Sequence, residues 1–287
     1  MQLRQSERKK AKIKMALQAP AGAGKTYSSL LLAHGLTNGD YSKVAIIDTE
    51  NGSADLYAHL GQYNVLTLSP PFSPDNYIKA IEVCEKAGME VIIIDSISHC
   101  WDYLLDYHSS LAGNSFTNWA KVMPLQKAFV SKILQADLHV ITTMRTKQDY
   151  VLNQKDGKFI PEKVGLKAVQ KDGLDYEFTI VFDVDIKHFA VSSKDRTGLF
   201  MGKPDFIINT STGQKILEWC NSGTNLNDAR EKIKATKTIE ELKKLYNQYS
   251  DWRELLEYDF KIQKETINSK ELLLNPKSFS TNGTTTH

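Results

Sequence analysis

Cysteine is scarce and scattered in this chain of 287 residues. Its three cysteines, Cys84, Cys100 and Cys220, form no Cys-x-x-Cys pair. Zinc sites and disulfide frameworks both depend on closely spaced or paired cysteines, so the sequence argues against a zinc-ribbon protein and a disulfide-stapled secreted domain. Free cysteines suit a reducing compartment, and we therefore expect a cytoplasmic protein.

A long hydrophobic run and an excess of one charge are also missing. No apolar stretch of signal-peptide or membrane-span length follows the basic segment 1–12, so no membrane association is expected. This segment is predicted to be a solvated tail, with an arm that contacts nucleic acid as the alternative. Lys and Arg number 36 against 34 Asp and Glu, which gives a net charge of +2. Any nucleic-acid binding must therefore come from local patches.

Several apolar runs predict buried strands of a parallel sheet that is covered on both faces. They are KIKMALQA (12–19), KVAIIDT (43–49), EVIIIDS (90–96) and LHVITTMRT (138–146). Segments with helical spacing alternate with these runs, at residues 25–36, 76–88 and 123–136. Such alternation implies right-handed β-α-β crossovers, so the predicted fold class is α/β, with a mainly parallel central sheet flanked by helices.

The pattern changes after residue 146. Residues 147–165 contain a Lys-Asp-Gly-Lys turn between β-prone pieces, which predicts a hairpin or a mobile loop. Residues 176–196 predict two antiparallel strands at one edge of the sheet. The domain organisation predicted from these patterns is a core at 13–220, a linker at 221–227, a helical appendix at 228–275 and a disordered tail at 276–287.

The strongest motif is APAGAGKT, Ala19 to Thr26, which follows a predicted strand and opens a predicted helix. This is the context of a P-loop, in which small residues let backbone amides and a helix N-terminus surround a phosphate. Lys25 is expected to bridge the β- and γ-phosphates of ATP, and the Thr26 hydroxyl to ligate Mg²⁺. The predicted nucleotide contacts are Ala21, Gly22, Ala23, Gly24, Lys25, Thr26 and Tyr27.

An aspartate ends the apolar run VIIIDS, Val91 to Ser96. A carboxylate at the end of a buried strand is costly unless it is satisfied, and a hydrated Mg²⁺ beside the P-loop would satisfy Asp95. A helix N-cap formed by Asp95 or Ser96 is the alternative. The sequence thus predicts a metal site of Thr26 and Asp95.

The segment KVAIIDTENGSADLY places Glu50 just past the strand that follows the P-loop helix. A carboxylate there can face the γ-phosphate and polarise the attacking water. With these motifs and SKDRTG, residues 13–220 resemble the RecA-like P-loop ATPases, among them RecA, RadA and the short phage-type RecA-like AAA-domain recombination ATPases. The resemblance implies that Glu50 is the catalytic glutamate and that Tyr57, seven residues on, stacks on adenine.

The same resemblance implies a sensor of the γ-phosphate at the end of the strand HVITTMRTKQ. RecA has a glutamine at this place, whereas this chain offers Thr143, Arg145 and Lys147. RecA-like proteins also bind DNA through two loops, which correspond here to Ser98–Asn118 and Lys147–Gly173. The first carries aromatic residues that include Trp101, and Trp119 follows it directly. The second carries the predicted DNA-binding residues Lys147, Lys155, Lys158, Lys163 and Lys167, although a lysine-rich solvated hairpin would have the same composition.

Two cations lie two positions apart in HFAVSSKDRTGLF, so on a strand both would point to the same side. Lys194 and Arg196 resemble the paired basic residues that, in RecA and RadA, reach the γ-phosphate of a neighbouring subunit. This resemblance implies an arginine-finger role and a homo-oligomer, ring or filament. A surface salt bridge is the alternative.

The function predicted from these features is that of a Mg-ATP-dependent, oligomeric ATPase acting on single-stranded DNA in phage or mobile-element recombination. The catalytic residues would be Lys25, Glu50, Asp95, Lys194 and Arg196. A single-strand-binding or recombination protein is an expected further partner. Two alternatives stay open: a RecA-fold motor or helicase loader that acts on a protein partner, and an ATP-binding switch with negligible hydrolysis, against which Glu50 argues.

Overall fold

The structure is a computed structural model that describes residues 10–155, 158–223, 226–249 and 252–274; for residues 148–155, 158–166 and 270–274 it describes the backbone only. The chain forms two compact units, one of residues 11–220 and one that contains the C-terminal helices. Each unit has a hydrophobic core of its own.

A nine-stranded sheet forms the centre of the first unit, with the order β3-β2-β4-β5-β1-β7-β8-β9 and with β6 paired to β5. The strands from β3 to β7 in this order are parallel, whereas β6, β8 and β9 are antiparallel to their neighbours. The bounds are β1 Lys14–Ala19, β2 Val44–Asp48, β3 Asn64–Thr67, β4 Val91–Asp95, β5 His139–Lys155, β6 Lys158–Ala168, β7 Ile180–Val184, β8 Phe189–Asp195 and β9 Phe206–Ile207. The predicted α/β class with a mainly parallel sheet is confirmed.

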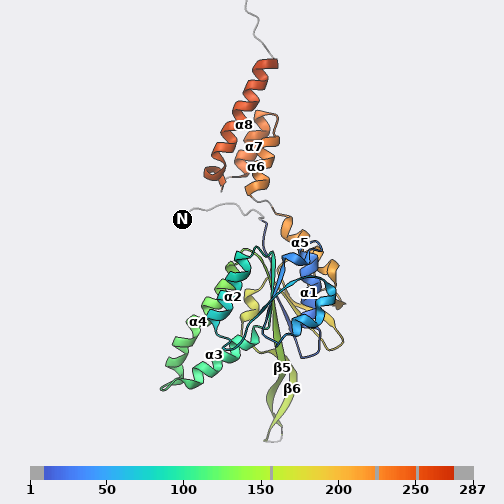
Figure 1. Ribbon diagram of the computed structural model, residues 1–287, viewed down its shortest axis with the longest axis vertical. Helices are drawn as coiled ribbons and strands as arrows, with labels where there is room; N and C mark the ends of the chain where they lie inside the picture. The colour runs from blue at the N-terminus through green and yellow to red at the C-terminus, as the bar shows by residue number, and fades with distance from the viewer. Residues whose placement is uncertain (1–9, 156–157, 224–225, 250–251, 275–287) are drawn as a thin grey trace, which may run out of the picture. The chain divides into compact units, whose positions relative to one another are not determined.

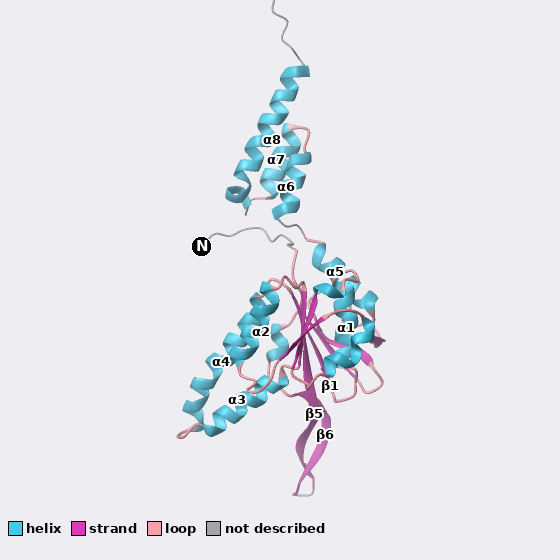
Figure 2. Cartoon of the chain, in the orientation of Figure 1, coloured by secondary structure: helices cyan, strands magenta, loops and turns pink. Residues whose placement is uncertain are grey.

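Helices cover both faces of the sheet (Figures 1 and 2). One layer holds α1 (Lys25–Leu36) and α5 (Thr210–Asn221), and the other holds α2 (Pro74–Lys86), α3 (Ser98–Ser110) and α4 (Ser115–Gln135). Successive strand residues face opposite layers, so Ile46 and Ile93 belong to one core cluster, and Ile47 and Ile94 to the other. Continuous Val/Ile runs are buried on both faces for this reason.

Helices α1 and α5 approach each other through two glycines. A Cβ atom on Gly35 of α1 would lie 2.2 Å from the carbonyl oxygen of Thr210, and one on Gly213 of α5 would lie 2.3 Å from that of Leu32. No side chain can occupy either position unless the helices separate. The close contact fixes α1, and with it the loop that precedes α1.

The strand β5 is longer than predicted, because it continues beyond the sheet into an antiparallel hairpin with β6. Figure 1 shows this hairpin projecting past the carboxyl ends of the parallel strands. Its register changes between Asp149 and Tyr150. Residues 147–155 and 158–165 therefore belong to the two strands of the hairpin that was one of the two sequence predictions. Lys155 and Lys158 pair at its tip, while Lys163 pairs with Tyr150.

The expectation of a loop at Ser98–Asn118 is wrong. This segment forms helix α3, a short connection and the first turn of α4, which begins eight residues earlier than the predicted helix at 123–136. The Asn114 side chain caps α4 by accepting a hydrogen bond of 2.8 Å from the backbone N–H of Phe116. The sequence did not predict these helices for two reasons. Aromatic residues have only a moderate helix propensity, and a proline such as Pro124, which lies inside α4, is unusual within a helix.

The part of the second unit that the structure describes forms the α-helices α6 (Leu226–Ala235), α7 (Ile239–Gln248) and α8 (Arg253–Leu274). Ala229, Ile233, Leu242, Tyr249, Leu256, Phe260 and Ile267 form its buried cluster. The side chain of Thr238 caps α7 by accepting a hydrogen bond from the backbone N–H of Glu241.

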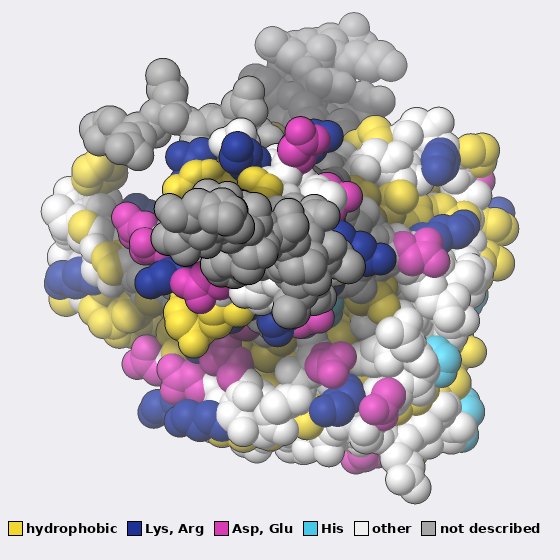
Figure 3. Space-filling model, turned by 90° about the horizontal axis from the view of Figure 1, so that it is seen from above, with side chains coloured by type: hydrophobic (Ala, Val, Ile, Leu, Met, Phe, Trp, Pro, Cys, Tyr) yellow, Lys and Arg dark blue, Asp and Glu magenta, His cyan; other side chains and the backbone are white. Residues whose placement is uncertain are grey.

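Surface charge is mixed in sign. On the face of the molecule seen in Figure 3, basic and acidic side chains lie interspersed, as the nearly balanced charge of the sequence leads one to expect. Within the described residues, no helix is both long enough and apolar enough to cross a membrane.

Candidate nucleotide-binding and catalytic site

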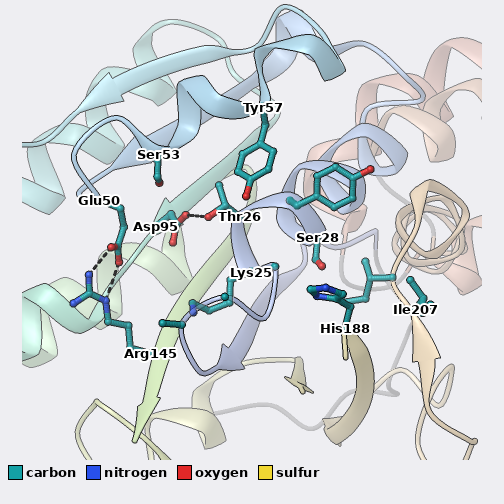
Figure 4. A pocket seen from close by; sticks show the side chains of 15 residues that line it. Lys25, Thr26, Ser28, Glu50, Ser53, Tyr57, Asp95, Arg145, His188 and Ile207 are labelled. Carbon is teal, nitrogen blue, oxygen red and sulfur yellow. Dashed lines mark hydrogen bonds and ion pairs between the residues drawn. The ribbon is translucent and has the colours of Figure 1, made fainter. Parts of the chain in front are cut away.

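A cavity of about 740 Å³ opens beside the loop that joins β1 to α1 (Figure 4). Residues from separate parts of the chain line it: Ala21, Gly22, Gly24, Lys25, Thr26, Tyr27, Ser28, Glu50, Ser53, Tyr57, Asp95, Arg145, His188, Ile207 and Ile208. Several of these follow the carboxyl ends of β1, β2 and β4, the edge at which open α/β sheets bind ligands.

The loop between β1 and α1 has the shape of a phosphate cradle. Gly22 and Gly24 adopt left-handed backbone conformations, with φ of 80° and 81°, which only glycine reaches at little cost. Helix α1 begins at Lys25 and directs its N-terminal amides toward the cavity. The Lys25 ammonium donates hydrogen bonds to the carbonyl oxygens of Ala19 (3.1 Å) and Pro20 (3.0 Å). Partial burial lowers the pKa of Lys25, although the carboxylates of Asp95 and Glu50 oppose this effect.

Asp95 ends β4 beside Thr26 and is only 1% exposed. Its two carboxylate oxygens accept hydrogen bonds of 2.5 Å, one from the Thr26 hydroxyl and one from the Thr143 hydroxyl. Burial raises the pKa of Asp95, and these two hydrogen bonds oppose the shift. No cationic side chain forms an ion pair with Asp95 among the described residues. A buried carboxylate next to a hydroxyl at a phosphate cradle fits Mg²⁺, which binds through one or two carboxylates together with substrate phosphates.

Asp48 occupies the position beside Asp95 on the neighbouring strand, and the two residues are in register. Asp48 is fully buried as well, but backbone N–H groups satisfy it: Glu50 donates at 2.6 Å and Ala54 at 3.2 Å. These bonds fold the segment after β2 back on itself and thereby place Glu50 at the cavity. Asp48 thus has a structural role, in contrast to Asp95.

Glu50 is bound by Arg145, which lies on β5 at the base of the hairpin. The guanidinium Nε donates to Glu50 Oε1 at 3.0 Å, and a terminal nitrogen donates to Oε2 (Figure 4). Burial opposes ionisation of Glu50, but the hydrogen bonds and charge of Arg145 outweigh it, so the pKa of Glu50 lies below its usual value. Both oxygens of the predicted catalytic carboxylate therefore face a cation from the predicted sensor strand.

Arg145 also connects this site to the hairpin and to α3. Its backbone N–H donates to the Ser98 hydroxyl at 2.9 Å, and its carbonyl oxygen accepts from Val169, just after β6, at 2.7 Å. Among the sensor candidates, Arg145 lines the cavity, whereas Thr143 is fully buried and contacts Asp95. Lys147 lies farther along β5, outside the lining of this cavity.

The other end of the cavity is aromatic and aliphatic. The rings of Tyr27 and Tyr57 lie with centroids 5.7 Å apart, and Ile207 and Ile208 line the same end. Both tyrosines were predicted from sequence, Tyr57 for adenine stacking. Apolar and aromatic walls of this kind suit a nucleobase, which leaves the phosphates for the glycine-rich loop.

His188 is a site residue that sequence reasoning missed. It lies in the turn between β7 and β8 with φ of 70°, lines the cavity, and its Nδ1 is 3.1 Å from the carbonyl oxygen of Ala23 in the phosphate loop. Ile207, Ile208 and Ser53 were also missed. His188, Ile207 and Ile208 carry no motif, because the pairing of distant strands brings them to the loop, whereas Ser53 lies three residues after Glu50.

Lys194 and Arg196 lie side by side, away from the cavity lining. Both donate to the carbonyl oxygen of Tyr176, Arg196 at 2.9 Å, and Lys194 also donates to the carbonyl oxygen of Asp175 at 3.0 Å. Asp195 between them accepts hydrogen bonds from Thr197, Phe200 and Met201, which fix the turn after β8. The two cations are therefore held in the chain itself, and their action on a neighbouring subunit stays a prediction.

A second cavity, of about 570 Å³, lies between the α3–α4 pair and the base of the β5–β6 hairpin. The stacked rings of Trp101 and Trp119, with centroids 6.0 Å apart, form one wall. Lys147, Lys167 and Lys171 line the other, together with Asp172, while Asp102 of α3 also lines the cavity. Lys147 and Lys167 are direct partners in the hairpin, and Lys167 pairs with Asp172. Of the predicted DNA-binding lysines, Lys155, Lys158 and Lys163 lie among the residues described only by their backbone.

Comparison with known proteins agrees with this geometry. A family model for the AAA domain matches residues 11–249, which covers the first unit and part of the second. None of the curated proteins compared with the chain matches it. The match and the phosphate loop together show that the chain belongs to the AAA-domain family and has the nucleotide site of a P-loop NTPase.

Proposed function

We propose that this protein hydrolyses ATP with Mg²⁺ as a RecA-like ATPase, assembles into a homo-oligomer and acts on single-stranded DNA in phage or mobile-element recombination. The observation that carries the proposal is the convergence of Lys25, Thr26, Asp95 and Glu50 on one cavity from three separate segments of the chain. A nucleotide-binding protein without hydrolysis has no need of a carboxylate at the position of Glu50.

Each residue has a part in this reaction that follows from its place. The amides of residues 22–26 and the Lys25 ammonium bind the phosphates and neutralise their charge. Thr26 and Asp95 would hold Mg²⁺, which would supply a positive charge at the phosphate oxygens. Glu50 orients and polarises the attacking water once an oxygen of its carboxylate is free of Arg145. Tyr27 and Tyr57 hold the base.

Single-stranded DNA is the proposed polymer because aromatic and cationic side chains meet in the second cavity. The indole ring of Trp101 can stack on a base of any sequence, while Trp119 is itself stacked against Trp101 and His108. Lysines supply phosphate contacts. The neighbouring acids Asp102 and Asp172 reduce the net positive charge, so base stacking contributes a large part of the binding in this proposal.

Arg145 provides a route from the DNA to the hydrolytic site. It forms the Glu50 ion pair with its side chain and the Val169 hydrogen bond with its backbone, so a movement of the hairpin would be transmitted to Glu50. We propose that the ion pair is the resting arrangement and that DNA in the second cavity releases Glu50 from Arg145. Hydrolysis would then depend on the presence of DNA.

Measurement of ATP turnover with and without a poly-dT oligonucleotide tests the proposal. We expect DNA to raise turnover several-fold, and expect the mass of the protein to increase when it binds a nonhydrolysable ATP analogue. Charge reversal at Lys147 and Lys171 should reduce stimulation, whereas the matched reversal at the exposed residues Lys79 and Lys203 should not. Charge removal at Lys155, Lys158 and Lys163 should likewise reduce the stimulation of ATP turnover by DNA. Turnover that ignores DNA would overturn the assignment of the DNA substrate.

A mixture of inactive subunits tests the oligomeric site. We expect Lys194→Ala/Arg196→Ala subunits and Glu50→Gln subunits each to be inactive alone, and their equimolar mixture to recover part of the activity. Recovery arises because some interfaces then combine an intact Glu50 with intact cations from the neighbour. A mixture that recovers nothing would contradict the action of Lys194 and Arg196 across an interface.

A further inference from the structure

The second unit, which here is called the helical unit, has a groove between α7 and α8 that the proposed ATPase reaction does not use. Ile239, Leu242, Lys243 and Tyr246 of α7 line one side, and Glu257, Phe260, Lys261 and Lys264 of α8 line the other. Both sets follow the spacing i, i+3, i+4, i+7, so each is one continuous face of its helix. The groove encloses about 370 Å³, which lies within the range of ligand-binding pockets.

The floor of the groove is apolar. Leu242 and Phe260 belong to the core of the helical unit and are 5% and 7% exposed, while Ile239 packs against the same cluster. Tyr246 closes one end, with its ring packed edge-on against Phe260 at 5.2 Å and 43% of its surface exposed. Such a floor accepts bulky aliphatic or aromatic side chains.

The rim of the groove is basic. Lys243, Lys261 and Lys264 are exposed and face a single acid, Glu257, so the lining carries two positive charges in excess. Arg253 adds a further cation next to Tyr246, with its guanidinium 4.6 Å from the ring centroid. Among the described contacts, none of the three rim lysines has an ion pair. The rim therefore favours an anionic ligand.

These features favour a peptide over a nucleic acid. Nucleobases bind to open aromatic faces, but Arg253 occupies a face of Tyr246, and Phe260 is buried. Ile239 and Leu242 instead offer aliphatic contacts that suit side chains such as Leu, Ile or Phe. Each lining face spans seven residues, which at 1.5 Å per residue is about 10 Å. This length matches about two turns of a bound helical peptide.

We propose that the groove between α7 and α8 is a docking site for an acidic segment of a partner protein that lays one or two bulky apolar side chains on the floor formed by Leu242 and Phe260. Lys243, Lys261 and Lys264 bind the carboxylates on either side. The proposal goes beyond the ATPase activity and holds whether or not the chain hydrolyses ATP.

Fluorescence polarisation with the full-length protein tests this site. The probe is a labelled 12-residue peptide rich in Asp and Glu with two Leu residues at i and i+4. One comparison peptide has Ser in place of both Leu, and another has Lys in place of the acids. We expect the first peptide to bind with an affinity that falls as salt increases, and both comparison peptides to bind at least tenfold more weakly.

Charge reversals on the protein provide the matched control. Lys243→Glu/Lys261→Glu changes the rim and should weaken peptide binding about tenfold, whereas Lys244→Glu/Lys232→Glu changes exposed lysines outside the groove and should change it less than twofold. All these side chains are exposed, so thermal melting should be unchanged in both variants. Equal binding by both variants would overturn the proposal. Displacement of the peptide by poly-dT would also overturn it, because the groove would then bind nucleic acid. Self-association of the protein that Lys243→Glu/Lys261→Glu abolishes and the control variant does not would overturn it as well, because the groove would then bind a second copy of the chain.

Discussion

Replacement of Asp95 by Asn should stabilise the folded protein while it abolishes ATP hydrolysis. Asp95 is 1% exposed, and burial raises the pKa of its carboxyl group, with the Thr143 and Thr26 hydroxyls opposing the shift. The two hydrogen bonds therefore offset only part of the free-energy cost of burying the charged carboxylate in the folded protein. An amide of the same shape removes this charge and leaves the packing unchanged.

The magnitude follows from two opposing contributions. The buried ion costs several kcal/mol. In the amide variant one Thr hydroxyl donates to the amide oxygen and the other turns to accept from the amide NH₂, so two hydrogen bonds to a charged acceptor become two neutral ones and lose about 1 kcal/mol each. The net gain in the free energy of unfolding is about 2 kcal/mol, which corresponds to an increase of roughly 4–8 °C in Tm for a unit of this size.

The effect has a defined dependence on pH. A carboxyl group whose folded pKa is raised binds protons more tightly in the folded state than in the unfolded state, where the value is 3.8. Its destabilising effect is therefore absent below the unfolded pKa and develops as the pH rises toward the folded pKa. The advantage of Asp95→Asn over the native chain should grow from acidic to neutral pH.

Asp48→Asn is the matched control, since Asp48 is the register partner of Asp95 on β2. Its carboxylate accepts from the backbone N–H groups of Glu50 and Ala54, and an amide would turn its own NH₂ toward one of them. The unsatisfied donor should cost about 1–3 kcal/mol. Urea unfolding of the nucleotide-free protein at several pH values measures both variants. If Asp95→Asn destabilises the protein as much as Asp48→Asn does, the account of Asp95 is wrong.

Three further variants test other parts of the structure. Gly35→Ala should lower the free energy of unfolding by about 2 kcal/mol, measured by urea unfolding, because the new Cβ meets the Thr210 carbonyl oxygen at 2.2 Å; a variant as stable as the native chain would contradict the α1–α5 contact. Arg145→Gln should lower the ratio of DNA-stimulated to basal ATP turnover, since the link between the hairpin and Glu50 is lost. An unchanged ratio would refute that link. Tyr57→Ala should weaken ATP binding by roughly tenfold in a fluorescent-nucleotide titration, in keeping with about 1–3 kcal/mol for a base stacked on an aromatic ring, and equal affinity would remove Tyr57 from the base site.

The sequence predicted the parts of the site that carry local motifs. Residues 19–26 combine the glycines of a P-loop with a following helical segment, and Asp95 ends a Val/Ile run. Both features can be recognised from residues that are neighbours in the sequence. The sheet was predictable for the same reason, because its central strands are buried on both faces. The edge strand β3 (Asn64–Thr67) was missed, since it is short and half-exposed.

Contacts between distant segments could not be predicted. The Glu50–Arg145 ion pair joins residues 95 positions apart. Glu50 follows β2 and Arg145 lies on β5, and the two come together because these strands flank β4 in the sheet. His188 reaches Ala23 across 165 positions in the same manner. The helices at Ser98–Asn118 were mistaken for a loop, because tertiary packing of aromatic side chains outweighs their weak intrinsic helix preference.

The most direct test of the central claim is a comparison of Glu50→Gln with the native protein for both ATP binding and ATP turnover. The side chains have the same shape, so the variant should bind Mg-ATP with an affinity within a few-fold of the native value. Its kcat should fall by at least 100-fold, as expected for the loss of a group that polarises the attacking water. Turnover close to the native rate in the presence of DNA would contradict the assignment of Glu50 as the catalytic carboxylate.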